Sequence, residues 1–98
     1  MIFEWNRQKA KENLSKHGVS FAEAEIAFED FFAIESLDDE HSTGEEHRYK
    51  MLALSGEKVL VVVYTMRSEI YRIISAREAE SYERKLYEKQ RGENFPNG

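Results

Sequence analysis

Residues 59–63 read Val59-Leu60-Val61-Val62-Val63, an unbroken apolar run near the middle of the 98-residue chain. A run of this kind is typical of a central strand that is covered on both of its faces. We expect this strand to extend over residues 57–66. Its neighbours in the sequence should then pair with it in one sheet.

Two further strands flank this run and are joined to it by short turns. We expect them over residues 47–54 and 69–75, where apolar residues recur. The turns at Ser55-Gly56 and at Arg67-Ser68-Glu69 are short enough for hairpins. Both neighbours should therefore run antiparallel to the central strand.

Two helices before the sheet are marked by capping signals. The first is expected after Asn6, a good N-cap, and before Gly18, which stands where a left-handed C-cap glycine is common. The second should begin at the capping box formed by Ser20 and Glu23.

A third helix is expected near the end of the chain, where Ser75 and Glu78 form a second capping box. Helical spacing also predicts which side chains face the core. They are Ala79, Tyr82 and Leu86 in this helix and Ala10, Leu14 and His17 in the first one.

Short strands over residues 2–5 and 31–37 complete the order strand, two helices, four strands, helix. This order predicts a single α+β domain over residues 1–90, with two N-terminal helices and one C-terminal helix packed on an antiparallel-rich sheet. Residues 91–98 lose the helical periodicity, and we expect them to form a mobile tail.

The composition excludes several kinds of site. The chain has no cysteine, which removes disulfides, zinc–thiolate sites and cysteine nucleophiles and suits a reducing cytosol. No apolar run approaches the length of a membrane span, and the first residues do not resemble a signal peptide. We therefore expect a cytoplasmic protein with no membrane attachment.

The net charge of −5 hides an uneven distribution of charge. Residues 21–47 contain ten Asp or Glu and no Lys or Arg, whereas the rest of the chain holds 14 basic and nine acidic groups, a balance of 14 − 9 = +5. One face can therefore attract RNA while another repels it, since salt screens each field within about 8–10 Å. The counts alone favour an ordinary solvated surface for the acidic block.

Cationic side chains stand at the ends of several expected elements. They are Lys16 and His17 in the first helix, Arg48 and Arg67 at strand ends, and Arg72 and Arg77 in or just beyond the last strand. Metal-free phosphodiester cleavage needs a base, an acid and cations that stabilise the phosphorane, and arginine binds phosphate in a bidentate way. Structural roles are the alternatives: His17 can pack in the core or cap the helix, and Arg77 can pair with Glu78 or Glu80.

Alternation along the central strand places Val63, Thr65 and Arg67 on one face of the sheet. Whether Arg72 or Arg77 joins them depends on the register of the second hairpin, which the sequence does not fix.

Two weaker signals concern aromatic and metal-binding residues. Trp5, Tyr64 and Tyr71 can stack on exposed bases, although core aromatics are more frequent. His41 and His47 lie in or beside an acidic loop over 38–46 and could hold a divalent ion, although such a pattern more often marks a flexible polar loop.

The chain resembles the BrnT toxin family in three stretches, which follow one another in the family's order. They are Phe3-Glu4-Trp5-Asn6 with Lys16-His17-Gly18-Val19 and Glu23-Ala24, then Val61-Val62-Val63-Tyr64-Thr65 with Arg67, and finally Arg72-Ile73-Ile74-Ser75-Ala76-Arg77 with Tyr87-Glu88; Glu46 and Arg48 match as well. The resemblance implies a ribonuclease toxin of a type II toxin–antitoxin system that has a RelE-like fold and needs no cofactor. Asn6 departs from the family, which commonly has Asp there.

The resemblance also implies a partner and a site. The partner would be a BrnA-type antitoxin with a ribbon–helix–helix domain, through which the complex would bind operator DNA. The acidic block itself suggests a further hypothesis, that residues 23–46 steer a basic segment of the antitoxin. The positions that match the family's shared polar residues, and are expected to be catalytic, are Lys16, His17, Arg48, Arg67 and Arg77. Those expected to contact RNA are Arg72, Tyr64 and Trp5.

The resulting hypothesis is metal-independent RNA cleavage that inhibits translation. Arg67 and Arg77 would hold the scissile phosphate, Lys16 would assist, and His17 or a carboxylate such as Glu69 would move protons. Two alternatives stay open: a module that binds protein or RNA without cutting it, and a metal-dependent nuclease that uses the histidines of the acidic loop.

Overall fold

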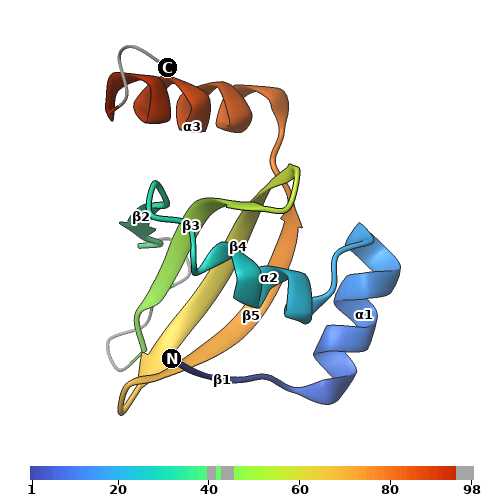
Figure 1. The fold of residues 1–98 in the computed structure, drawn as a ribbon. Helices are drawn as coiled ribbons and strands as arrows, with labels where there is room; N and C mark the ends of the chain where they lie inside the picture. The colour runs from blue at the N-terminus through green and yellow to red at the C-terminus, as the bar shows by residue number, and fades with distance from the viewer. Residues whose placement is uncertain (40–41, 43–45, 95–98) are drawn as a thin grey trace.

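The computed structural model describes residues 1–39, 42 and 46–94, and in them it shows one sheet of five strands with three helices (Figure 1). The strands are β1 (Ile2–Glu4), β2 (Ile34–Leu37), β3 (Arg48–Ser55), β4 (Lys58–Arg67) and β5 (Ile70–Glu78). The helices are α1 (Arg7–His17), α2 (Phe21–Ala27) and α3 (Ser81–Asn94). The predicted α+β class and element order are confirmed.

The strands lie in the order β1-β5-β4-β3-β2, so the apolar run forms the central strand β4. β1 is parallel to β5, and the other three pairs are antiparallel. Both hairpins turn through two residues, Gly56-Glu57 and Ser68-Glu69, the first of them one residue later than expected. The φ angles of Gly56, Ser68 and Glu69 are 61°, 48° and 69°, the left-handed values that tight hairpins favour.

The N-terminal helices begin and end at the predicted capping residues. The Asn6 side chain accepts a hydrogen bond from the Lys9 N–H at 2.9 Å, and Gly18 ends α1 with a φ of 68°. Ser20 and Glu23 form the expected capping box at the start of α2. The bend between the helices places α1 beside β5 and α2 across one face of the sheet (Figure 1).

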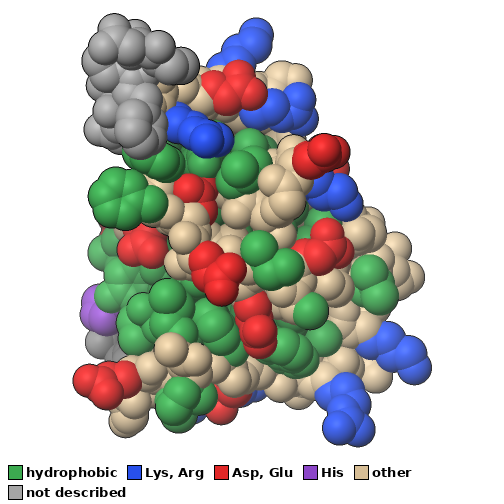
Figure 2. Space-filling model, viewed as in Figure 1, with side chains coloured by type: hydrophobic (Ala, Val, Ile, Leu, Met, Phe, Trp, Pro, Cys, Tyr) green, Lys and Arg blue, Asp and Glu red, His purple; other side chains and the backbone are tan. Residues whose placement is uncertain are grey.

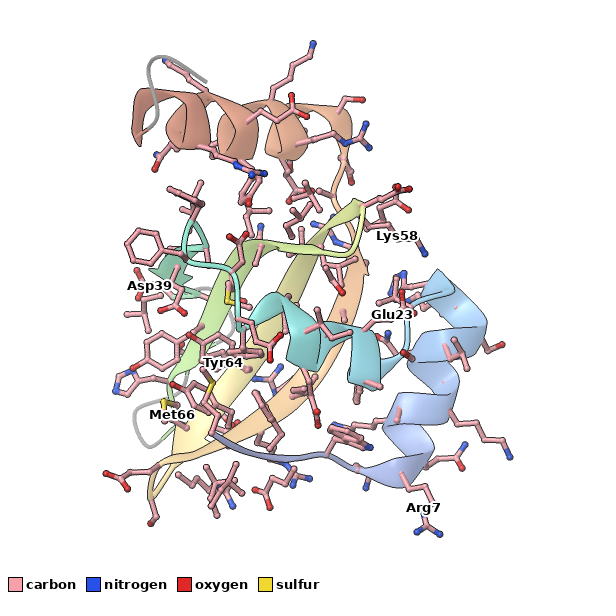
Figure 3. The ribbon with its side chains drawn as sticks, in the orientation of Figure 1. Arg7, Glu23, Asp39, Lys58, Tyr64 and Met66 are labelled. Atoms are coloured by element: carbon pink, nitrogen blue, oxygen red, sulfur yellow. The ribbon has the colours of Figure 1, made fainter. Side chains whose placement is uncertain are left out.

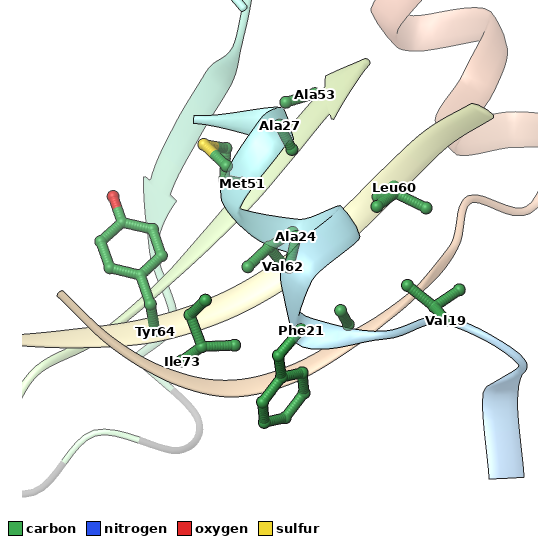
Figure 4. Packing of buried hydrophobic residues seen from close by; sticks show 11 residues of the cluster. Val19, Phe21, Ala24, Ala27, Met51, Ala53, Leu60, Val62, Tyr64 and Ile73 are labelled. Carbon is green, nitrogen blue, oxygen red and sulfur yellow. The ribbon is translucent and has the colours of Figure 1, made fainter. Parts of the chain in front are cut away.

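The main core lies between α2 and this face of the sheet (Figure 4). Its members come from α2, from the segment before it and from β3, β4 and β5. They are Val19, Phe21, Ala24, Ala27, Met51, Ala53, Leu60, Val62, Tyr64, Ile73 and Ala76. Burial of this apolar surface holds the first two helices against the sheet.

Among the described residues, a helix covers the opposite face of the sheet at one end only. There Ala79 and Tyr87 pack with Leu52, Val59 and Val61 in a second buried cluster. The first half of β4 is therefore covered on both faces, as predicted. No described helix packs over the later residues of β4 on this face, and we call this part of the sheet its open end.

The expected start of the last helix is wrong. Ser75 and Glu78 do not cap a helix, because β5 continues to pair with β4 as far as Glu78. α3 begins at Ser81, and the Glu83 carboxylate accepts a hydrogen bond from the Glu80 N–H at 2.9 Å. This shift turns Glu83 inward and leaves Tyr82 66% exposed.

The expected inner stripe of α1 is confirmed for Ala10, which packs against the core, and is wrong for Leu14 and His17. Leu14 is 50% exposed and His17 is exposed, whereas Asn13 is buried. The Asn13 amide accepts a hydrogen bond from the Ala76 N–H at 3.1 Å and donates one to the Ala76 carbonyl at 2.7 Å. It thereby pairs with an edge of β5 that the short β1 does not reach.

The ends of two elements also differ from prediction. β2 begins at Ile34 and not at residue 31, because Asp30 accepts a hydrogen bond from the Phe32 N–H and fixes a turn there. α3 continues to Asn94, beyond the predicted helix, and residues 95–98 of the predicted tail lie outside the described residues. No described helix is long and apolar enough to cross a membrane.

Candidate nucleic-acid interface

The open end of the sheet gathers cationic side chains from neighbouring strands. Val63, Thr65 and Arg67 alternate with core residues along β4 and share this face. In β3, Lys50 is the partner of Val63 and Arg48 is the partner of Thr65, so both point to the same face. Two strands thus bring three cations together.

A β-bulge adds two more cations from β5. Ile73 pairs with Tyr64 and Ser75 pairs with Val63, which leaves Ile74 as an extra residue between them. Arg72 therefore pairs with Thr65 and Arg77 pairs with Val61, and both lie on the open face. The structure thereby fixes the register that the sequence left undecided.

A groove of about 300 Å³ lies on this face. Its lining combines three cations, Arg48, Lys50 and Arg77, with the carboxylate of Asp38 and with apolar side chains of the sheet. The lining residues are Asp38, Arg48, Lys50, Val61, Val63, Ile74, Ser75 and Arg77. Three convergent cations among apolar side chains form a site suited to a phosphate group.

Arg77 is held in this groove by a carboxylate from α3. Its guanidinium donates hydrogen bonds to both Glu83 oxygens, at 2.8 and 2.9 Å, and Lys50 Nζ lies 3.6 Å from Glu83. Glu83 is only 3% exposed. Hydrogen bonding to Arg77 lowers the pKa of Glu83 to about 2 against the effect of burial, and the same contact raises the pKa of Arg77.

The outer cations have longer and more exposed partners. Glu46 lies 3.9 Å from Arg48 Nε and 3.5 Å from Arg67, and Glu4 lies 3.5 Å from Arg72. Exposed ion pairs at such distances contribute little to stability, so these arginines can exchange partners at small cost. They are better placed than Arg77 to turn toward a ligand.

Lys16 and His17 lie in a neighbouring pocket at the end of α1. The pocket is lined by Lys9, Glu12, Asn13, Lys16, His17, Ile74 and Ser75. Ile74 and Ser75 also line the groove, so the two hollows meet at the bulge of β5. The structure thus places the predicted helix-end pair beside the groove and not inside it.

The aromatic candidates lie on the other side of the sheet. Tyr64 is 3% exposed and points to the helix-covered face (Figure 4). Its ring packs there on Phe28 and Tyr49. Burial raises its pKa above the usual value for tyrosine. Trp5 contacts the Phe21 ring edge-on. Tyr64 therefore presents no ring face for a base, and neither residue lines the groove.

One groove residue was missed in the sequence. Lys50 lies two positions after Arg48 in a predicted strand, so alternation alone places both on one face. The metal alternative gains no support from the described residues, among which no three potential ligands converge. His47 is exposed, and His41 lies outside the described residues.

The helix-covered side has the opposite character. Asp and Glu side chains lie there among hydrophobic ones, with Lys and Arg toward the edges (Figure 2). A second groove of about 300 Å³ lies between β1 and α2, with Glu25, Glu29 and Ile26 in its lining. Ile26 is 50% exposed. The uneven charge of the sequence is thus separated in space.

These features define a small single-domain α+β protein with a cation-lined groove on the open end of its sheet. The sequence model of the ribonuclease toxin BrnT of type II toxin–antitoxin systems matches residues 5–83. The chain belongs to this family, which confirms the resemblance found in its sequence, and membership implies an antitoxin partner. No curated protein sequence matches the chain significantly.

Proposed function

We propose that this chain is a metal-independent endoribonuclease that cleaves RNA in the cytoplasm and inhibits translation when no antitoxin is bound. The observation that best supports this activity is the convergence of five cations on one open sheet face. They are Arg48, Lys50, Arg67, Arg72 and Arg77. A face of this kind holds a phosphate backbone without a metal ion.

Cleavage would proceed by attack of the ribose 2′-oxygen on the adjacent phosphorus. A base removes the 2′-hydroxyl proton, the new O2′–P bond forms, the P–O5′ bond breaks, and an acid protonates the leaving O5′. Arg48, Arg67 and Arg77 stabilise the charge on the phosphorane, while Lys16 contacts the RNA from the neighbouring pocket. The products are a 2′,3′-cyclic phosphate and a 5′-hydroxyl.

Two groups are candidates for the proton transfers. His17 lies in the pocket that meets the groove at Ile74 and Ser75. Glu46 lies between Arg48 and Arg67, a position that favours it over Glu69, for which the described residues show no ion pair with Arg67. The carboxylate would act as base and the histidine as acid.

The antitoxin would be of the BrnA type, with a ribbon–helix–helix domain that carries the complex to operator DNA. The acidic groove beside α2 suits a basic segment that also carries apolar side chains. Steering by Glu25 and Glu29 would speed the encounter.

The activity is tested with a labelled RNA and with the same RNA carrying a single 2′-deoxy nucleotide at the cleavage position. The proposal predicts that only the all-ribose RNA is cut and that its products end in a cyclic phosphate and a 5′-hydroxyl. A product with a 5′-phosphate would contradict this chemistry. RNA that is bound but stays intact would favour the binding-module alternative.

A further inference from the structure

Thr65 carries a buried hydroxyl with no hydrogen-bond partner among the described residues. The residue is 1% exposed and lies on the cationic face of β4, two positions beyond Val63 of the groove lining. A buried hydroxyl without a partner is costly, whereas valine has the same shape without this cost. Packing alone therefore does not explain why threonine and not valine stands at this position.

The residues that pair with Thr65 in the sheet suggest a ligand for its hydroxyl. Arg48 is its partner in β3 and Arg72 is its partner in β5, so the three residues form one cross-strand row. Adjacent strands lie about 4.8 Å apart, which puts the two arginine backbones roughly 10 Å apart with Thr65 midway. Both side chains are long enough to meet above the hydroxyl.

Each of these arginines already has a carboxylate partner near the row. Arg48 leans toward Glu46 at 3.9 Å and Arg72 leans toward Glu4 at 3.5 Å, the next position in the row. Each arginine side chain is about one-third exposed, so an anionic oxygen ligand can compete with these contacts. The contacts of Arg48 with Glu46 and of Arg72 with Glu4 are longer than the contact of Arg77 with Glu83, so a ligand can replace them more easily.

We infer that a backbone phosphate of the RNA binds over Thr65, between Arg48 and Arg72, and accepts a hydrogen bond from the Thr65 hydroxyl. This inference rests on the proposed function and adds a phosphate position one step beyond the groove that holds Arg77. The bound phosphate gives the hydroxyl its missing partner and replaces Glu46 and Glu4 beside the two arginines. Because Thr65 is 1% exposed, the side chains that cover it move aside as the phosphate binds. Thr65 acts as a positioning group for the RNA backbone.

The test compares Thr65→Val with Thr65→Ser on the full chain. Binding is measured by fluorescence anisotropy with a labelled 2′-O-methyl RNA, which cannot be cut because its 2′-oxygen has no proton. Thr65→Val should bind about tenfold more weakly, keep the wild-type salt slope, and melt at or above the wild-type temperature. Thr65→Ser should bind as the wild type does.

The salt dependence of RNA binding distinguishes the contribution of the arginines from that of the Thr65 hydroxyl. Arg72→Met should lower the slope of log K against log salt by about one, because one phosphate contact is lost. Wild-type affinity in Thr65→Val would overturn the inference, and so would its failure to fold, since the hydroxyl would then serve the protein itself. If the wild type does not bind this RNA at all, the proposed function fails with it.

Discussion

Arg72 and Arg77 lie on the same face of β5 although they are five positions apart in the sequence. In a regular strand an odd separation puts two side chains on opposite faces. The extra residue Ile74 restores the match, because Ile73 and Ala76 both remain in the helix-side core on either side of the bulge. The bulge therefore decides how much positive charge the open face carries.

This shared face predicts a specific effect of charge removal on RNA binding. Arg48→Ala and Arg72→Ala should each weaken binding to any RNA sequence and lower the salt slope by about one. Arg7 extends into solvent from the first turn of α1, so Arg7→Ala is the matched control and should leave the slope unchanged (Figure 3). Equal slopes in all three variants would show that RNA does not bind this face.

The Arg77–Glu83 pair predicts how stability depends on pH. The pKa of Glu83 is lowered to about 2, while that of an unfolded glutamate is about 4.3. Its contribution to folding is therefore complete above about pH 4.5 and is lost as the pH falls toward 2. Glu83→Gln should cost about 2–3 kcal/mol at pH 7, because it leaves Arg77 without its charge partner.

Urea unfolding at pH 7, 4 and 2.5 measures this dependence. The difference between wild type and Glu83→Gln should shrink steadily over that range. Glu88→Gln, on an exposed position of the same helix, serves as the control and should follow the wild type. A difference that stays constant with pH would contradict the assigned ion pair.

The hydrogen bonds of Asn13 predict a large effect for a small change. Asn13→Ala removes the partner of the Ala76 N–H and carbonyl, which lie at a buried strand edge. We expect a loss of about 2–4 kcal/mol and a melting temperature lower by roughly 10 °C or more. Asn6→Ala, which removes only a helix cap, should cost about 1 kcal/mol. Calorimetry that ranks the two variants equally would refute the edge-pairing role.

The hydrogen bonds between Asn13 and the edge of β5 explain why the buried face of α1 was predicted wrongly from the sequence. The strands, the first two helices and their caps follow from local residue types such as Asn6, Gly18 and Ser20. Hydrophobic periodicity selected Leu14 for the core, but α1 lies along a strand edge that needs hydrogen bonds, so Asn13 is the buried residue. The hydrophobic periodicity of a helix does not show whether the strand beside it has unpaired backbone groups.

In the candidate site, too, some features follow from local sequence and others depend on contacts between elements. Alternation placed Thr65 and Arg67 together, and it could also have found Lys50. The bulge at Ile74 and the pairing of Arg77 with Glu83 depend on contacts between elements. Ser75 and Glu78 misled the prediction because a capping-box pattern also fits a strand when a partner strand is available.

The acidic side of the molecule predicts the kinetics of antitoxin binding. Reversing Glu25 and Glu29 to Lys should slow association with the antitoxin at low salt and flatten its salt dependence, with a smaller effect on dissociation. Reversal of Glu12 and Glu88, which lie outside the groove beside α2, is the control. Stopped-flow measurements with identical association rates in both double variants would exclude steering by this groove.

The most direct test of the central claim is cleavage of a labelled single-stranded RNA in EDTA by the wild type, Arg48→Ala and Arg67→Ala. We predict that the wild type cuts without a metal ion and that each folded variant is slower by about 10²–10³. Full cleavage by both variants would show that the open sheet face is not the catalytic site. Intact RNA with the wild type, or cleavage that EDTA abolishes, would contradict a metal-independent ribonuclease.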